Sequence, residues 1–144
     1  MAQSKYGDCI KHSQLIRDIP YYLGKSIVAH DGELDADCSI GYHCIGKPMA
    51  FDRPHAHDFP EMLCFIGGNP ADILDLGGEV EFTIGEEGEE EVHVITSSSV
   101  VSIPSNVRHC PIVFARVDRP IIFLEISLTR IWKPGGPPPD KDPG

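Results

Sequence analysis

Short apolar stretches separated by turn residues recur along most of the chain. They are rich in valine, isoleucine and phenylalanine, and several of them alternate apolar with polar positions. Alternation with a period of two is typical of β-strands that bury one face. We expect strands over residues 25–30, 38–45, 49–57, 61–68, 79–85, 91–97, 99–104, 111–117 and 120–128. Short strands at regular spacing predict an all-β sandwich or barrel.

The two ends of the chain depart from this pattern. Residues 1–24 are a predicted N-terminal arm, in which Pro20 ends any short helix. Residues 25–132 form the predicted barrel domain. Residues 133–144 are rich in proline and glycine and hold no core-forming side chains, so we expect a flexible tail there.

Composition narrows the classes of partner. The chain has 144 residues, with 12 Lys and Arg against 22 Asp and Glu, and a formal net charge of −10. Nucleic acids and anionic membrane surfaces attract clustered cationic side chains, so we predict binding to neither. No apolar run approaches the length of a bilayer span, and no signal peptide is visible. The five cysteines form no CxxC pair, which favours reduced thiols and a cytoplasmic location.

Three histidines and one glutamate are the candidate site. His55 and His57 lie two residues apart on a predicted strand, so their side chains share a face at roughly 7 Å along the backbone. An antiparallel partner could bring Glu61 beside them, and His109 is the natural fourth member. Imidazole nitrogens with one carboxylate suit a divalent transition metal: iron, manganese, nickel, cobalt or zinc. The alternative is a polar cluster that is only hydrogen-bonded.

The spacing of these residues resembles the two sequence motifs of the cupin family. The first cupin motif reads His-x-His, three or four residues, Glu, six residues, Gly. The matching residues here are His55, His57, Glu61 and Gly68, with three and six residues in the gaps. This motif is far more specific than a lone HxH.

The second cupin motif contains Pro-x-Gly, two residues and His. Pro104, Asn106 and His109 match it, with asparagine in place of glycine. Asparagine tolerates a positive φ better than most residues, so we expect the turn to survive. Other positions depart from the family: Met49 and Ser98 replace the leading glycines, and Val113 replaces the final asparagine.

The resemblance implies a jelly-roll barrel, the double-stranded β-helix of the cupins, over most of residues 25–128. It implies one divalent transition metal held by His55, His57, Glu61 and His109. It also implies a homodimer, in which the N-terminal arm could be exchanged between subunits.

Side chains near this cluster are candidates for contact with a small-molecule ligand or substrate. Arg53 shares a face with His55 and could clamp a carboxylate. Leu63 and Phe65 share the face of Glu61 and could form an apolar wall.

Strand alternation bears on two further positions. Tyr42 and His43 lie on opposite faces of an early strand, so one of them could enter the ligand pocket; alternation does not choose between them, and we name Tyr42 as the candidate. Cys110 follows His109, so alternation turns it away from the cluster and favours a small core residue.

Open positions on the predicted metal favour an enzyme over a binding module or a structural or storage barrel. We expect a dioxygenase, or a lyase, isomerase or decarboxylase that uses the metal as a Lewis acid. The substrate class is a small oxygenated metabolite: a carboxylate, a diketone, an enediol or a catechol. Glu61 is the candidate catalytic base. The alternative is a non-catalytic cupin module that binds or senses a metal or small molecule, because one fold supports many functions.

Overall fold

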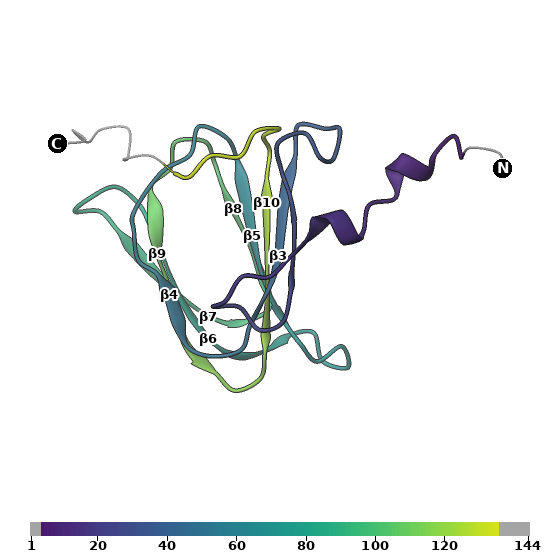
Figure 1. Ribbon diagram of the computed structural model, residues 1–144. Coiled ribbons are helices and arrows are strands. Elements are labelled where there is room, and N and C mark those ends of the chain that lie inside the picture. The colour runs from purple at the N-terminus through teal and green to yellow at the C-terminus, as the bar shows by residue number, and fades with distance from the viewer. Residues whose placement is uncertain (1–3, 136–144) are drawn as a thin grey trace.

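Two antiparallel β-sheets curve around one interior (Figure 1). The structure is a computed structural model that describes residues 4–135. Its strands are β1 (Ile16–Arg17), β2 (Ser26–Ala29), β3 (Ser39–Ile45), β4 (Met49–Phe51), β5 (Glu61–Gly67), β6 (Asp75–Ile84), β7 (Glu91–Ser97), β8 (Ser99–Ile103), β9 (His109–Val117) and β10 (Ile121–Ser127). Two short 3-10 helices, η1 (Gly7–Cys9) and η2 (Ser13–Leu15), precede them. The all-β prediction is confirmed.

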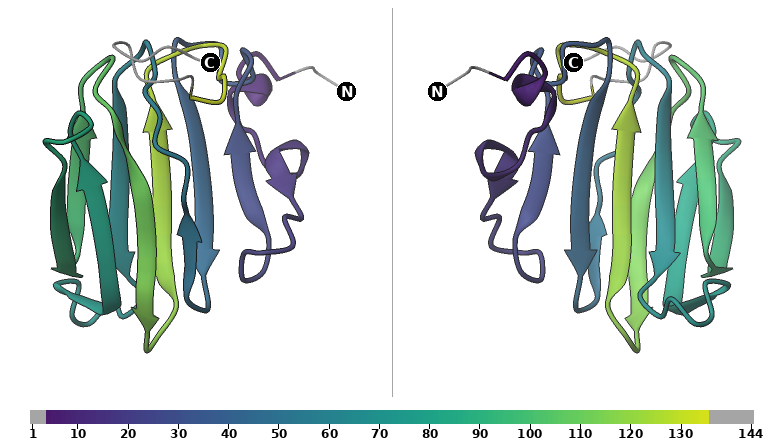
Figure 2. Two further views of the ribbon diagram at one scale, coloured as in Figure 1. Left: turned by 90° about the vertical axis from the view of Figure 1, so that its left-hand side faces the viewer. Right: turned by 90° about the vertical axis from the view of Figure 1, so that its right-hand side faces the viewer.

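Strand order places the middle of the chain beside its C-terminal part. The first sheet has the order β1-β2-β3-β10-β5-β8, and the second has the order β4-β9-β6-β7. Figure 2 shows the strands running nearly parallel to one axis on both sides of the barrel. The predicted strand 49–57 ends early, at Phe51. Pro54 follows it, and a proline has no backbone N–H to donate to a neighbouring strand.

Phenylalanine side chains from both sheets build the core. Phe65 and Phe123 stack with ring centroids 5.3 Å apart, and Phe114 meets Phe65 at 5.9 Å. These rings and Phe82 are at most 2% exposed. Burial of such large apolar groups is the main source of stability for a sheet-on-sheet fold.

Gly68, the glycine of the first motif, lies just after β5. A Cβ atom at this position would lie 2.8 Å from the carbonyl oxygen of Pro120. The close approach of this backbone therefore explains why glycine stands there, without any need for an unusual φ.

The N-terminal residues point away from the barrel. Tyr6 and Ile10 are 66% and 71% exposed on a segment that leaves the body of the molecule (Figures 1 and 2). The predicted arm of residues 1–24 also contains β1, which pairs with β2 at the edge of the first sheet. Of the predicted tail, residues 136–144 lie outside the described residues. The described part of the chain holds no helix long and apolar enough to cross a membrane.

Truncation of the core ring Phe114 tests the packing. We expect Phe114→Ala to lower the free energy of unfolding by about 3–5 kcal/mol, because it leaves a cavity between the sheets. Val94→Ala is the control, since Val94 is 59% exposed on β7 and should change stability by less than about 0.5 kcal/mol. Denaturant unfolding measures both, and equal effects would contradict the described core.

Candidate metal centre

Glu61 is fixed at the start of β5 by its neighbours in the sheet. It lies opposite Ser127 of β10 and Ile103 of β8. The hydroxyl of Ser127 donates a hydrogen bond of 3.1 Å to Oε2 of Glu61. The glutamate is 5% exposed. Its carboxylate is therefore held inside the barrel with at least one lone pair still available.

Backbone hydrogen bonds join the two motifs directly. The N–H of His55 donates to the carbonyl of His109 at 3.0 Å, and the N–H of His109 donates back to His55 at 2.9 Å. The N–H of Asn106 donates to the carbonyl of His57 at 2.6 Å. Asn106 has a φ of 66°, as we expect for an asparagine that replaces a turn glycine. Segments far apart along the chain, residues 55–57 and 106–109, thus form one site.

Hydrogen bonds at Nδ1 orient two of the three imidazoles. Nδ1 of His55 lies 2.6 Å from the carbonyl oxygen of Arg53, and Nδ1 of His109 lies 2.9 Å from that of Val107. A carbonyl oxygen only accepts, so each Nδ1 carries the proton and each Nε2 of a neutral ring keeps a lone pair. This is the usual way in which proteins fix the tautomer of a metal-binding histidine.

The nitrogen and oxygen atoms that could bind a metal lie close together. Nε2 of His109 lies 3.6 Å from one carboxylate oxygen of Glu61, and Nε2 of His57 lies 3.8 Å from the other. The candidate ligand atoms of these three residues all lie within 4.8 Å of one another. Nε2 of His109 is buried and has no hydrogen-bond partner among the described residues. An unpaired buried acceptor costs free energy, and a cation between these atoms removes that cost.

His55, the fourth predicted ligand, lies beside the rings of His57 and His109. Its ring centroid lies 4.9 Å from that of His57 and 4.5 Å from that of His109. Its ligand atom groups with those of His109 and Cys110, again within 4.8 Å. The structure therefore brings together all four predicted ligands, with His109 common to both groups.

The protonation states suit a metal. Burial lowers the pKa of His55 and of His57, so both rings are neutral near pH 7. Burial by itself raises the pKa of Glu61, but the neighbouring His109 and His57 outweigh it and hold this pKa below its usual value. Neutral imidazoles beside an ionised carboxylate are the ligand forms that a divalent transition metal requires.

A cavity of ≈ 460 Å³ opens from this cluster into the barrel. Arg53 and Leu63 line it, as predicted. Tyr42 does not line it; its neighbour His43 does, because alternation along β3 turns His43 inward. Phe65 also lies outside the lining and packs in the aromatic core instead.

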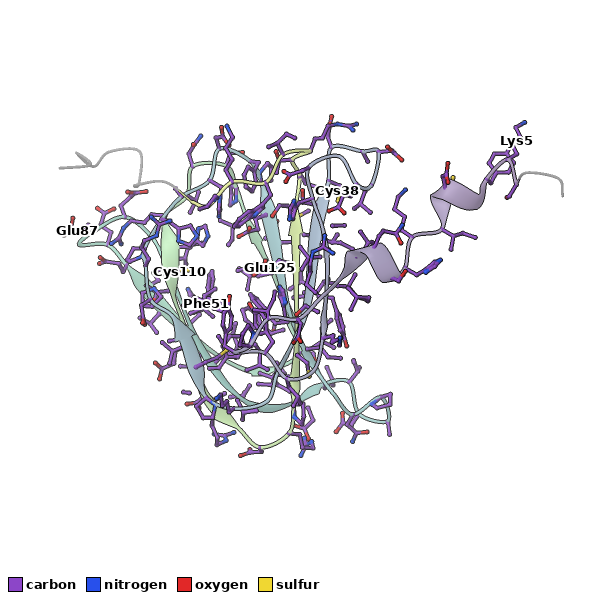
Figure 3. All side chains as sticks on the ribbon, in the orientation of Figure 1. Lys5, Cys38, Phe51, Glu87, Cys110 and Glu125 are labelled. Carbon is purple, nitrogen blue, oxygen red and sulfur yellow. The ribbon has the colours of Figure 1, made fainter. Side chains whose placement is uncertain are left out.

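Cys110 is a small buried core residue, as the sequence predicts. It does not face away from the cluster, however, because it lines the cavity on the same side as His109. Cys110 has a φ of 78°, so the regular alternation of β9 does not hold at its second residue. Figure 3 shows Cys110 on the β9 wall of the barrel. Burial raises the pKa of its thiol to about 12, so the thiol is protonated near pH 7.

The last described residues cover one side of the cluster. The ring centroid of Trp132 lies 6.3 Å from that of His57. Gly135 is buried, its backbone packs against the His55 ring, and its carbonyl accepts a hydrogen bond from Arg53. A segment predicted to be a flexible tail therefore begins as part of the cavity wall.

Two other cavity residues were not singled out from the sequence. Glu125 and Ser127 both line the cavity. Glu125 is the one carboxylate within the apolar strand IIFLEIS, and that position carried a recognisable signal. For Ser127 we find none, because a serine at the end of a strand is common.

Comparisons with solved structures show the fold of this chain. No protein-family model matches the chain, and no curated protein sequence matches it. Among solved structures, a Bacillus subtilis oxalate decarboxylase studied for its Mn(II) centres is similar, with a TM-score of 0.58 and 15% identity over 82% of this chain and 28% of the other. The oxalate decarboxylase–formate complex of Lactobacillus farciminis gives a TM-score of 0.56 and 20% identity over 82% and 31%.

Vicilin from Corylus avellana, the hazelnut, is equally similar in shape. Its TM-score is 0.59, with 12% identity over 90% of this chain and 35% of vicilin. The chain thus spans about a third of the length of these proteins. Identities this low establish the arrangement of strands and leave activity open. With its two antiparallel sheets and its matches to these structures, the chain has the cupin fold.

Proposed function

We propose that this protein is a metal-dependent cupin enzyme that acts on a small oxygenated metabolite. The ligands are His55, His57, Glu61 and His109, which hold one divalent transition metal. The observation that carries the proposal is the buried Nε2 of His109, which has a lone pair and no hydrogen-bond partner among the described residues. It lies 3.6 Å from one carboxylate oxygen of Glu61, and Nε2 of His57 lies 3.8 Å from the other oxygen. The Mn(II) centres of the similar oxalate decarboxylase support it.

The residues around the cluster suit chemistry on a chelating oxygen ligand. A bound divalent metal would supply a Lewis acid or, if it is redox-active, a route to dioxygen. Arg53 lies at the cavity and can orient a carboxylate through its guanidinium group. Leu63 and Ile112 line the cavity with apolar surface and exclude water from the reacting groups. Glu61 is ionised, and a carboxylate oxygen that is free of the metal can accept a proton from the substrate.

Two reaction types fit this arrangement. One is a dioxygenase, and the other is a non-redox lyase, isomerase or decarboxylase. Both need a ligand small enough for a cavity of ≈ 460 Å³ and able to offer two oxygens, such as a hydroxy acid, a diketone, an enediol or a catechol.

Removal of one imidazole at a time tests the ligand set. We expect purified wild-type protein to hold one equivalent of a divalent metal. His57→Ala and His109→Ala should weaken metal affinity by at least about 100-fold, since each removes a ligand outright. Elemental analysis after dialysis measures the content, and oxygen uptake with candidate acids, diketones and catechols then identifies the reaction type.

His93→Ala is the matched control, because His93 lies on β7 with its side chain 58% exposed. It should keep the full metal content. Iron with oxygen uptake indicates the dioxygenase, whereas another metal with product formed and no uptake indicates Lewis-acid chemistry. Full metal content in both cluster variants would contradict the ligand set. Metal without turnover of any candidate would favour a binding or sensing module.

We also infer that the protein is a homodimer in which residues 4–12 pack against the second subunit. The support is the exposure of Tyr6 and Ile10 on a segment that leaves the barrel (Figure 1). A chain that lacks residues 1–12 keeps Leu15 and β1, so its fold should persist while its sedimentation shifts to that of a monomer. An unchanged dimer would reject a role for this segment, and Asp72→Ala serves as a control at an exposed polar position outside it.

A further inference from the structure

A carboxyl group lies in the cavity wall away from the metal cluster. Glu125 occupies the middle of β10, opposite Gly41 of β3 and Leu63 of β5. Figure 3 labels it on the β10 wall, facing the interior. Within residues 4–135 its carboxyl group receives no hydrogen bond. Glu125 is half-buried and lines the cavity, so a ligand bound there could become the hydrogen-bond partner of this carboxyl group.

His43 stands beside Glu125 and is held rigidly. A Cβ atom at Gly41 would lie 2.9 Å from Nε2 of His43 and 3.2 Å from Oε2 of Glu125, so both atoms share the space that this glycine leaves. Nδ1 of His43 is hydrogen-bonded to the hydroxyl of Ser26 at 2.7 Å. The ring stacks on Tyr22 with centroids 4.0 Å apart. One ring nitrogen is therefore occupied, and the other is directed to the cavity.

Neither group is charged near neutral pH. Burial, with a smaller contribution from Glu61, raises the pKa of Glu125 to about 8. Burial lowers the pKa of His43 to about 4. A protonated carboxyl group can donate and accept a hydrogen bond, as can a neutral imidazole. This pair suits an uncharged hydroxyl or carbonyl group better than a carboxylate or an ammonium group.

The position of Glu125 relates it to the metal cluster. Ser127, which binds Glu61, lies two residues further along the same face of β10. Two residues of a strand span roughly 7 Å. Leu63, directly opposite Glu125 on β5 and two residues from Glu61, lines the cavity with apolar surface. A short ligand with apolar middle atoms could therefore contact both the metal cluster and Glu125.

We propose that Glu125 and His43 form a second recognition site, which binds the distal hydroxyl or carbonyl group of the ligand held at the His–Glu cluster. This inference rests on the proposed function, since it takes the near end of the ligand to be chelated. The ligand class is then a short oxygenated chain whose far end is polar and uncharged.

The protonation of Glu125 can be measured without any ligand. Its pKa is raised from 4.5 to about 8 on folding, so the folded state retains a proton that the unfolded state releases. Stability from this group is fully present below pH 4.5 and is lost as the pH rises through 8. We expect metal-free wild-type protein to lose stability relative to Glu125→Gln across this range. The other titratable groups facing Glu125, which are Glu61, His43, Tyr22 and Cys110, remain in both proteins, and a pH-independent difference would contradict the assignment.

Ligand selectivity is the decisive test. The probes are three α-hydroxy acids of equal chain length, matched to the roughly 7 Å span and ending in methyl, hydroxyl or carboxylate. Binding to the Co²⁺-loaded protein is followed by the visible absorption of Co²⁺. We expect the wild type to bind the hydroxyl-ended acid about tenfold more tightly than the other two. Glu125→Leu should abolish this preference, whereas Glu125→Gln should keep part of it, since an amide still donates and accepts.

Controls separate this inference from the proposed function. Both Glu125 variants should bind Co²⁺ as tightly as the wild type, and Glu91→Gln, at a side chain 71% exposed, should change nothing. Equal binding of methyl-ended and hydroxyl-ended acids, or an intact preference in Glu125→Leu, overturns the second site alone. A protein that takes up no Co²⁺, or binds no probe when loaded, overturns the proposed function and this inference with it.

Discussion

The pair of backbone hydrogen bonds between His55 and His109 is the constraint on which the site depends. These bonds close the barrel wall where β9 begins and bring together segments that are distant along the chain. Each of the two residues also donates its Nδ1 proton to a carbonyl two residues earlier. Backbone position and ring tautomer are thus set by the same short segments, and both Nε2 atoms are left as acceptors inside the barrel.

Other parts of the barrel position Glu61 and fix the distance between the two sheets around this pair of residues. Ser127 and the register of β5 with β10 hold Glu61 opposite the rings. The phenylalanine core fills the interior beyond the cavity and fixes the spacing of the two sheets. Apolar walls with a few polar groups are the usual composition of a ligand site, and here the polar groups form two sets at a separation that suits a small molecule.

The sequence predicted the elements that follow from local chemistry. Alternation located the strands, and the spacing of His55, His57, Glu61 and His109 indicated the cluster that the structure brings together. The turn at Asn106 was also predictable from the sequence, because asparagine tolerates the positive φ that the structure has there. Tyr42 and Cys110 show the limit: the inward face of β3 and the irregular backbone after His109 depend on the packing of the whole barrel.

Crystallographic location of the metal tests the central claim most directly. Crystals grown with Zn²⁺ and measured on both sides of the zinc absorption edge would show the ion by its anomalous signal. We expect one peak at about 2.0–2.2 Å from the Nε2 atoms of His55, His57 and His109 and from a carboxylate oxygen of Glu61. A zinc peak elsewhere, with none between these four side chains, would contradict the account.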